Sequence, residues 1–391
     1  MAKRERRVLI AGGGIGGLAA AIALGRGGIE TSVLDRSSFT EETGAGIQLG
    51  PNATRALATL GVLEVIEPFA FRPEAIWIHD GISGRRLQSV LLGKSAEQRY
   101  GAPYLTLHRA DLHSGLLAVA QGLTAVELRA SFAVTAIETR GGETVAKDAA
   151  GSEAKGGSLI GADGLWSTVR SLVAPEASLR FTGASAWRAL VPRQGLPSPF
   201  DAPVVGLWLG PRAHLVHYPV RGGDDLNVVA VAEGGVGSQG WNQTGDASAL
   251  KLPFDRWTKD VRSLLEWAIG WRSWSLYRLT PPLRRWSSGA IGLLGDAAHP
   301  VLPFLAQGAA LAIEDALALG ACMAACPGDP PLAFLRYEVL RRSRTARVQR
   351  LSRRFGRIYH ASGPLRLARN LVLERRNETE ALKIFDWLYG A

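Results

Sequence analysis

The chain has 391 residues, of which 47% are hydrophobic and 20% are charged, so it is long enough for a large core and two lobes. Its net charge is +10, and the segment from Arg336 to Arg376 holds thirteen arginines against two acidic residues. Two cysteines with no histidine beside them exclude a disulfide framework and a zinc site, and we expect no metal.

Partners and location follow from the same composition. The arginine-rich segment lacks interleaved aromatic residues, so we expect a solvated helix face and no nucleic-acid partner. No apolar run approaches the roughly 18 residues of a membrane span, so we expect no integral membrane segment. The first strand begins too early for a signal peptide, which predicts a cytoplasmic protein. A homodimer would be ordinary and is left open.

The first elements surround a glycine-rich loop. The apolar patterns predict a buried strand over 7–11, a helix over 15–28 and a second strand over 30–34. In the loop, Gly12 permits a tight turn, Gly14 lets the backbone approach a pyrophosphate, and Gly17 lets the helix pack on the strand. The peptide groups of Ile15 and Gly16, at the start of the helix, would donate hydrogen bonds to the phosphates.

An acidic residue completes this dinucleotide-binding fingerprint. The second strand ends at Asp35, where a carboxylate can accept hydrogen bonds from the ribose hydroxyls. Asp35 would repel a phosphate on that ribose, although Arg36 beside it weakens the argument. The fingerprint predicts a bound dinucleotide but does not by itself distinguish NAD from FAD.

The rest of the chain alternates between helical and strand-rich regions. After a glycine-rich loop at 43–50 we expect a helix over 51–60, strands within 75–88 and a helix over 111–121 with Asp111 as its N-cap. A strand-rich region follows over 181–279, with strands at 204–209, 214–219 and 227–232. A buried strand over 290–294 and a helix over 307–325 return the chain to the first lobe, and the remainder is helical.

Two further strands end in an aspartate. The apolar strand before Gly161 leads to Asp163 and Gly164, and the strand before Gly295 leads to Asp296. Asp163 could face the phosphates and ribitol of a dinucleotide, or simply cap the next helix. A carboxylate at Asp296 could accept hydrogen bonds from a ribityl chain. The start of the helix near Gln307, Gly308 and Ala309 could face the flavin edge that gains negative charge on reduction.

Taken together, these motifs resemble the single-component FAD-dependent aromatic hydroxylases of the salicylate hydroxylase and 3-hydroxybenzoate 6-hydroxylase type. The resemblance spans nearly the whole chain. It rests on the Gly12 loop with Asp35, on 44–53 (GAGIQLGPNA), 108–112 (HRADL), Asp163-Gly164 with Ser167 and Arg170, 295–300 (GDAAHP), Gln307-Gly308 and 314–316 (EDA).

This resemblance implies FAD as the bound cofactor, with NADH or NADPH and O2 as co-substrates. The reduced flavin would form a C4a-hydroperoxide and hydroxylate a small phenolic or hydroxy-aromatic acid. Arg109 would contact the pyrophosphate and ribityl region, and Asp296 the ribityl chain. The full set of expected FAD-binding residues is Gly12, Gly14, Ile15, Gly16, Gly17, Asp35, Arg36, Gln48, Arg109, Asp163, Asp296, Pro303, Gln307, Gly308 and Ala309.

The strand-rich region carries the expected catalytic residues. With a period of two, His214 and Tyr218 share one strand face, where they would line the substrate pocket. His214 is the expected base for the phenol proton, and Tyr218 would orient the ring. The alternative is that both are merely hydrogen-bonded within a sheet. His299 is expected to support its loop, and Arg188 either the fold or a substrate carboxylate.

The resemblance also implies an α/β fold of the p-hydroxybenzoate hydroxylase type. We expect a Rossmann-like FAD-binding domain over 1–180 and 281–335, a β-rich substrate domain over 181–280, and an arginine-rich helical region over 336–391. Pro303 stands where some 3-hydroxybenzoate 6-hydroxylases have a polar side chain, which puts that substrate in doubt. Two alternatives remain: a hydroxylase of a larger quinone-precursor or polyketide ring, and a FAD-binding oxidase or regulatory protein that does not hydroxylate.

Overall fold

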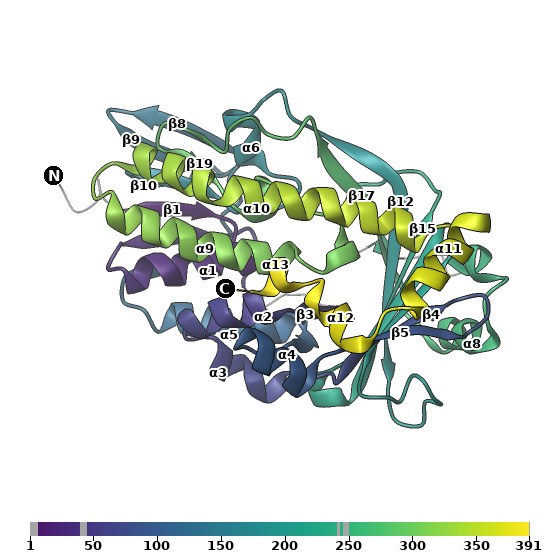
Figure 1. The fold of residues 1–391 in the computed structure, drawn as a ribbon. Helices are drawn as coiled ribbons and strands as arrows, with labels where there is room; N and C mark the ends of the chain where they lie inside the picture. The colour runs from purple at the N-terminus through teal and green to yellow at the C-terminus, as the bar shows by residue number, and fades with distance from the viewer. Residues whose placement is uncertain (1–6, 40–44, 241–242, 245–249, 391) are drawn as a thin grey trace.

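The computed structural model describes residues 7–39, 45–240, 243–244 and 250–390. Two large sheets lie at opposite ends of the molecule, and helices cover and connect them (Figure 1). The first sheet has six strands in the order β18-β19-β11-β1-β2-β7. These strands span Ser287–Ser288, Ile291–Leu293, Ser158–Gly161, Val8–Ala11, Thr31–Leu34 and Val126–Arg129.

The centre of this sheet is parallel and buried on both faces. β1 pairs in parallel with β2 and with β11, and all residues of these three strands are buried. Such strands need helices on both faces, which explains their continuous apolar sequence. Helix α1 (Ile15–Arg26) packs on α9 (Gly308–Ala325) through small residues, since a Cβ added at Gly16 would lie 3.2 Å from that of Ala312.

The second sheet has eight strands in the order β16-β17-β12-β15-β14-β13-β4-β5. They span Gln243–Thr244, Arg272–Thr280, Ser178–Pro192, Asp225–Glu233, Ala213–Val220, Val205–Gly210, Ala75–Asp80 and Arg86–Leu91. The last two strands, β4 and β5, come from within 1–180. They belong to this sheet because β4 pairs in parallel with β13. The β-rich lobe therefore includes two strands that the sequence pattern alone does not connect to 181–280.

Two smaller sheets complete the strands. β3 (Gly46–Leu49) pairs with β6 (Leu105–His108), so part of the expected loop at 43–50 is a strand, while positions 43 and 44 lie outside the described residues. The other small sheet has the order β10-β9-β8, with strands Glu153–Gly156, Glu143–Lys147 and Ala136–Arg140.

The predicted helices are present, with one correction at a helix start. α2 (Pro51–Thr59) begins at its proline, as expected. α5 (Arg109–Gln121) begins earlier than predicted, and its N-cap is His108, whose ring accepts a hydrogen bond from the Ala110 N–H, rather than Asp111. Shorter helices are α3 (Leu63–Ile66), α4 (Gly93–Tyr100), α6 (Thr168–Val173) and α8 (Lys259–Trp267).

The C-terminal helices connect the two large sheets. α10 (Pro330–Tyr359) runs along the molecule from the six-stranded sheet to the eight-stranded one (Figure 1). It is followed by α11 (Gly363–Glu374), α12 (Glu378–Lys383) and α13 (Asp386–Tyr389). By length and composition α9 could cross a membrane, but half of it is buried inside the protein against α1 and its neighbours.

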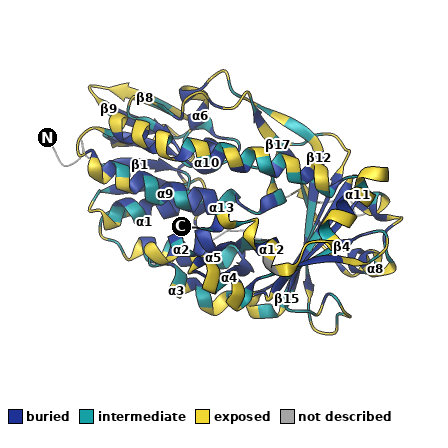
Figure 2. Cartoon of the chain, in the orientation of Figure 1, coloured by how far each residue is buried: buried dark blue, intermediate teal, exposed yellow. Residues whose placement is uncertain are grey.

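The arginine-rich segment is only partly the solvated face that its sequence suggests. Arg350 and Arg357 are exposed on α10, whose outer face is open along its length (Figure 2). Arg341 is buried, and Arg366 on α11 donates to both oxygens of the buried Asp80 at 2.8 and 2.6 Å. These ion pairs attach the C-terminal helices to the two lobes.

Candidate active site

The glycine-rich loop between β1 and α1 is tightly packed on one side and open on the other. Gly12 has a φ of +105°, and a Cβ added there would lie 2.5 Å from the backbone oxygen of Ala162. A Cβ added at Gly17 would lie 1.9 Å from the backbone oxygen of Gly12, whereas one at Gly14 would meet nothing within 4 Å. The open side adjoins the free N–H groups of α1, where a pyrophosphate fits.

Asp35 holds this loop in place. Its Oδ2 accepts a hydrogen bond from the Gly13 N–H at 2.5 Å, and its Oδ1 accepts the Ser37 hydroxyl at 2.7 Å. His113 on α5 supports the other side of the loop, with Nε2 2.8 Å from the Gly13 carbonyl oxygen. No sequence motif indicates a role for this histidine. The ribose contact of Asp35 stays a prediction, as does any role of the exposed Arg36.

Asp163 caps a helix, which was one of its two expected roles. Its Oδ2 accepts hydrogen bonds from the Thr168 and Val169 N–H groups at 2.8 and 3.1 Å, at the start of α6. Its buried Oδ1 has no partner among the described residues, and burial raises the pKa of the carboxyl group. A contact between this oxygen and a bound cofactor stays a prediction.

Asp296 and the start of α9 lie on the same side of the molecule as the glycine-rich loop. Asp296 belongs to a 3-10 turn (Gly295–Ala297) after β19, and burial raises the pKa of its carboxyl group. A second 3-10 turn (Pro303–Leu305) leads to Gln307, the N-cap of α9. The N–H groups at the start of α9 therefore face the same cavity as those of α1.

One cavity of about 360 Å³ joins these elements to the eight-stranded sheet. Of the predicted residues, it brings together Gly14, Ile15, Gly16, Gln48, Arg109, Arg188, His214, Tyr218, Asp296, Pro303, Gln307, Gly308 and Ala309. The cavity lining does not include Gly12, Gly17, Asp35, Arg36 or Asp163. Gly12 and Gly17 act through packing. Asp35 acts through a hydrogen bond to the glycine-rich loop, and Asp163 through hydrogen bonds to the start of α6.

The chain offers FAD a fitting set of groups. Gly14 leaves room for a close approach, and two helix starts, at Ile15 and Gly308, present backbone donors. Arg109 and Asp296 supply a cation and a carboxylate at the cavity wall. This combination suits a molecule with a pyrophosphate, a hydroxylated chain and a flat ring.

The eight-stranded sheet presents alternate residues of β14 to this cavity. His214, Val216 and Tyr218 line it, while Leu215 packs in the core on the other face, as the period of two predicts. His214 is buried, and burial, followed by the nearby His360, lowers the pKa of its imidazole well below the usual value. Its Nδ1 lies 2.9 Å from Nε2 of His360, a residue that the sequence did not mark.

Polar residues flank the histidine in the cavity. Gln48 accepts a hydrogen bond from the Tyr104 hydroxyl at 2.8 Å and also interacts with the Tyr218 hydroxyl. Burial raises the pKa of Tyr218, so its hydroxyl keeps its proton. Arg188 on β12 lines the same cavity, with its guanidinium 5.4 Å from the ring centre of Trp274.

A buried network behind the cavity holds the loop that carries Asp296. Nε2 of His299 lies 2.6 Å from Oδ2 of Asp315, and Arg341 donates to the other oxygen at 2.7 Å. Burial opposes ionisation of Asp315, but His299 and Arg341 outweigh it and hold the pKa of the carboxyl group below its usual value. The structure thus gives His299 the supporting position expected for it. The sequence did not indicate Arg341, which comes from the distant α10.

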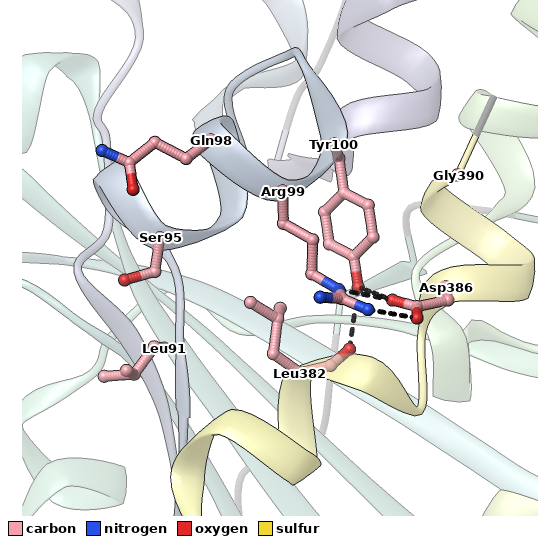
Figure 3. Close-up of a pocket in the computed structure, with 8 residues that line it drawn as sticks. All are labelled: Leu91, Ser95, Gln98, Arg99, Tyr100, Leu382, Asp386 and Gly390. Atoms are coloured by element: carbon pink, nitrogen blue, oxygen red, sulfur yellow. Dashed lines mark hydrogen bonds and ion pairs between the residues drawn. The ribbon is translucent and has the colours of Figure 1, made fainter.

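A separate cavity of about 600 Å³ lies between α4 and the C-terminal helices (Figure 3). Arg99 donates from its Nε to Asp386 at 2.7 Å, and the Tyr100 hydroxyl donates to the Leu382 carbonyl at 2.8 Å. These contacts secure the C-terminal helices to α4. The residues lining this cavity are separate from those that line the cavity of His214.

Comparison with known proteins agrees with this geometry. The FAD binding domain family matches residues 5–351. The 3-hydroxybenzoate 6-hydroxylase of Polaromonas naphthalenivorans (strain CJ2) is 40% identical over 384 residues, which cover 98% of this chain and 95% of that protein. A 3-amino-4-hydroxybenzoate 2-monooxygenase of Streptomyces cremeus is 37% identical over 391 residues, covering 100% of this chain and 96% of that one.

Solved structures show the same fold. Klebsiella pneumoniae HpxO complexed with FAD and uric acid has a TM-score of 0.86 at 25% identity, covering 98% of this chain and 97% of that chain. A salicylate hydroxylase substrate complex has a TM-score of 0.82 at 23% identity, with 99% and 96% covered, and supports the fold alone. The p-hydroxybenzoate hydroxylase-type architecture predicted from the motifs is confirmed. This chain belongs to the family of FAD-dependent aromatic hydroxylases.

Proposed function

We propose that this enzyme hydroxylates a single-ring hydroxybenzoate, with 3-hydroxybenzoate as the first candidate and 2,5-dihydroxybenzoate as its product. The observation that carries the proposal is that one face of the eight-stranded sheet presents both Arg188 and His214 to one cavity. The reaction consumes the hydroxybenzoate, NAD(P)H, a proton and O2, and yields the dihydroxybenzoate, NAD(P)+ and water.

The strand register supports this arrangement. Arg188 on β12 pairs with Val229 on β15, which pairs with Val216 on β14. These three residues form a row across the sheet, and His214 lies two positions along β14 from the end of the row. Two strand spacings combined with two residues along β14 amount to about 12 Å between the two backbones, a span that the long arginine side chain shortens towards one benzoate ring. The carboxylate would pair with Arg188 and the phenol with His214.

The chain's own residues have defined tasks in this proposal. FAD, when bound, accepts hydride from NAD(P)H and activates O2. Asp35, Arg109 and Asp296 would help to bind it, with the start of α9 beside its ring. Apolar side chains such as Val216 and Val231 keep water from the substrate. His214 takes the phenol proton, which makes the ring electron-rich enough to attack an electrophilic oxygen.

The choice of substrate draws on the named relatives and on the side chains at the cavity wall. The named relatives act on 3-hydroxybenzoate or 3-amino-4-hydroxybenzoate, both single-ring acids. Pro303 has no side-chain donor. The phenol would therefore depend on His214 and Tyr218 for its hydrogen bonds.

A substrate panel tests the proposal. The FAD-loaded protein is given 2-, 3- and 4-hydroxybenzoate and 3-amino-4-hydroxybenzoate, and NADH and NADPH oxidation, O2 uptake, H2O2 and product are measured. We expect 3-hydroxybenzoate to stimulate oxidation with one product per NAD(P)H and little H2O2. If every benzoate leaves oxidation unstimulated while a larger phenol stimulates it, the single-ring proposal is wrong. NAD(P)H oxidation that yields only H2O2 with all of them would indicate an oxidase.

We also propose that the enzyme works in the cytoplasm, where NAD(P)H is regenerated, and that any association is as a homodimer. Analytical ultracentrifugation of the FAD-loaded protein measures the second point directly. A sedimentation coefficient for one chain of 41.7 kDa at micromolar concentration would contradict a dimer. Fractionation of cells that make the protein tests the first point, since enzyme recovered with the membrane pellet would contradict it.

A further inference from the structure

A chain of hydrogen bonds leads from the substrate cavity to solvent through residues far apart in the sequence. His214 Nδ1 lies 2.9 Å from Nε2 of His360, and His360 Nδ1 lies 3.0 Å from Oε1 of Glu233. His360 follows the last residue of α10 and is buried, whereas the side chain of Glu233 at the end of β15 is 41% exposed. His360 and Glu233 also line a second cavity, here named the outer cavity, which shares no lining residue with the substrate cavity.

The order of donors and acceptors along this chain follows from its outer end. An ionised carboxylate only accepts hydrogen bonds, so His360 must donate from Nδ1 to Glu233. A neutral His360 then accepts at Nε2, and His214 donates from Nδ1. The remaining nitrogen of His214, Nε2, is left without a proton at the substrate cavity. A base for the phenol requires this tautomer.

The buried position of His214 makes such a path necessary. An imidazolium ion in a water-excluded cavity is costly, and burial lowers the pKa of both His214 and His360. It is therefore unfavourable for His214 to keep an added proton. A base that passes its Nδ1 proton outwards as it gains one at Nε2 avoids holding a net charge in the cavity.

We propose that His360 and Glu233 form a proton path that fixes the reactive tautomer of His214 and conducts the phenol proton to solvent. The phenol O–H bond breaks as the His214 Nε2–H bond forms. The Nδ1 proton of His214 moves to Nε2 of His360, and the Nδ1 proton of His360 moves to Glu233 and then to water. No electrons are transferred. A proton returned to the product phenolate by the reverse route restores both tautomers.

The charges around the path suit this role. Nε of Arg212 lies 3.4 Å from Oε2 of Glu233, and three further arginines from two elements line the outer cavity. They are Arg278 on β17 and Arg353 and Arg357 on α10. These guanidinium groups place positive charge around the outer end of the path, and burial lowers the pKa of His360. Towards the protein, Phe304 and Tyr359 pack against the ring of His214 and keep it from water.

His360→Ala combined with chemical rescue tests the path. We expect the variant to keep its FAD but to hydroxylate 3-hydroxybenzoate about 10²-fold more slowly. Because the outer cavity has a volume of about 760 Å³, added imidazole can reach the vacated position and should restore most of the lost rate. A purely structural role would not give rescue that rises with the neutral fraction of imidazole. Arg354→Gln, which changes an exposed side chain on α10 outside this cavity, is the control and should keep the wild-type rate.

A second measurement does not depend on the substrate. Glu233→Gln changes a half-exposed side chain, so folding should be preserved, and ¹⁵N-histidine NMR of the FAD-loaded protein reports each imidazole tautomer. We expect the nitrogen shifts of both His360 and His214 to change in this variant. The path is overturned if those of His214 stay constant, or if His360→Ala hydroxylates at the wild-type rate or is slow without rescue.

This inference rests on the proposed function for its phenolic substrate, and the two can fail separately. If wild-type protein does not hydroxylate 3-hydroxybenzoate while Glu233→Gln alters the His214 tautomer, the substrate proposal fails and the path stands. If wild-type protein hydroxylates 3-hydroxybenzoate but the nitrogen shifts of His214 do not change in Glu233→Gln, the substrate proposal stands and the path fails.

Discussion

In the proposed mechanism, single side chains in the cavity divide the work between binding and proton transfer. Arg188 and His214 both line it, yet they lie on different strands and differ in charge. A neutral, buried imidazole suits proton acceptance, and a guanidinium suits a carboxylate. Substitutions at the two positions should therefore affect different kinetic constants.

His214→Asn should keep the FAD spectrum and lose hydroxylation. The loss of the base should lower kcat by about 10²–10⁴-fold, since general base catalysis contributes that much. Product formation is measured against NAD(P)H oxidation, because substrate that is not ionised should favour H2O2. Hydroxylation at the wild-type rate would show that His214 is not the base.

Arg188→Met should mainly raise KM. The loss of a charge-assisted pair with a carboxylate costs about 1.5–3 kcal/mol, or roughly 10–100-fold in KM for hydroxybenzoates. Arg180→Met is the matched control, because Arg180 lies on the same strand and is exposed. For a substrate amide, which lacks the negative charge, Arg188→Met should raise KM less than it does for the acid. Equal losses for both would contradict a carboxylate contact.

At the scale of elements, the support of the site comes from a helix late in the chain. Arg341 on α10 is 8% exposed and pairs with Asp315 on α9, which in turn holds His299. Removing one partner of a buried pair leaves an uncompensated charge. The pair thus links the position of α10 to the loop that ends at the cavity.

Arg341→Met should therefore lower the free energy of unfolding by about 3–5 kcal/mol, the usual cost of breaking a buried pair. Urea unfolding of the FAD-loaded protein measures it. Arg350→Met on the same helix is the control, because Arg350 is exposed, and it should change stability by less than about 0.5 kcal/mol. The same small change for both variants would contradict the supporting role of Arg341.

Local sequence patterns predicted those elements whose own residues repeat with the period of a helix or of a strand. The helix expected over 15–28 spans Ile15–Arg26, and the strand expected over 214–219 spans Ala213–Val220. The pairing of β4 with β13 could not be predicted, because no local period reports which distant strand becomes a neighbour. The contacts of His360 and Arg341 were hidden for the same reason: an arginine-rich helix looks solvated until its partners are known.

At the scale of the whole molecule, several histidines are buried, and burial favours their neutral form. The pKa values of His79, His214, His217 and His360 are lowered, in each case mainly by burial, and that of His217 falls to about 3. Both nitrogens of His217 lack partners among the described residues. The unfolded chain, with an ordinary histidine pKa of 6.5, binds more protons than the folded one below that pH.

Stability should accordingly be complete above pH 6.5 and fall as the pH is lowered towards 5. A histidine whose folded pKa lies below this window, as that of His217 does, contributes a slope of up to about 1.4 kcal/mol per pH unit. Tm of the FAD-loaded protein is measured from pH 7.5 to 5, above the ordinary pKa values of aspartate and glutamate. The ring of His217 packs against Phe200 and Trp208 and does not line the cavity, so His217→Leu should flatten the dependence by about one histidine. A Tm that does not change over this range would contradict the neutral state of these residues.

The interleaving of the six-stranded sheet has a consequence for how the chain reaches this fold during synthesis. α1 packs on α9, which is synthesised almost 300 residues later, and β11 pairs with β19, which is synthesised about 130 residues later. Such long-range contacts make folding slow, and at typical translation speeds the apolar face of α1 stays uncovered for tens of seconds. The nascent chain should therefore depend on chaperones until α9 has emerged from the ribosome.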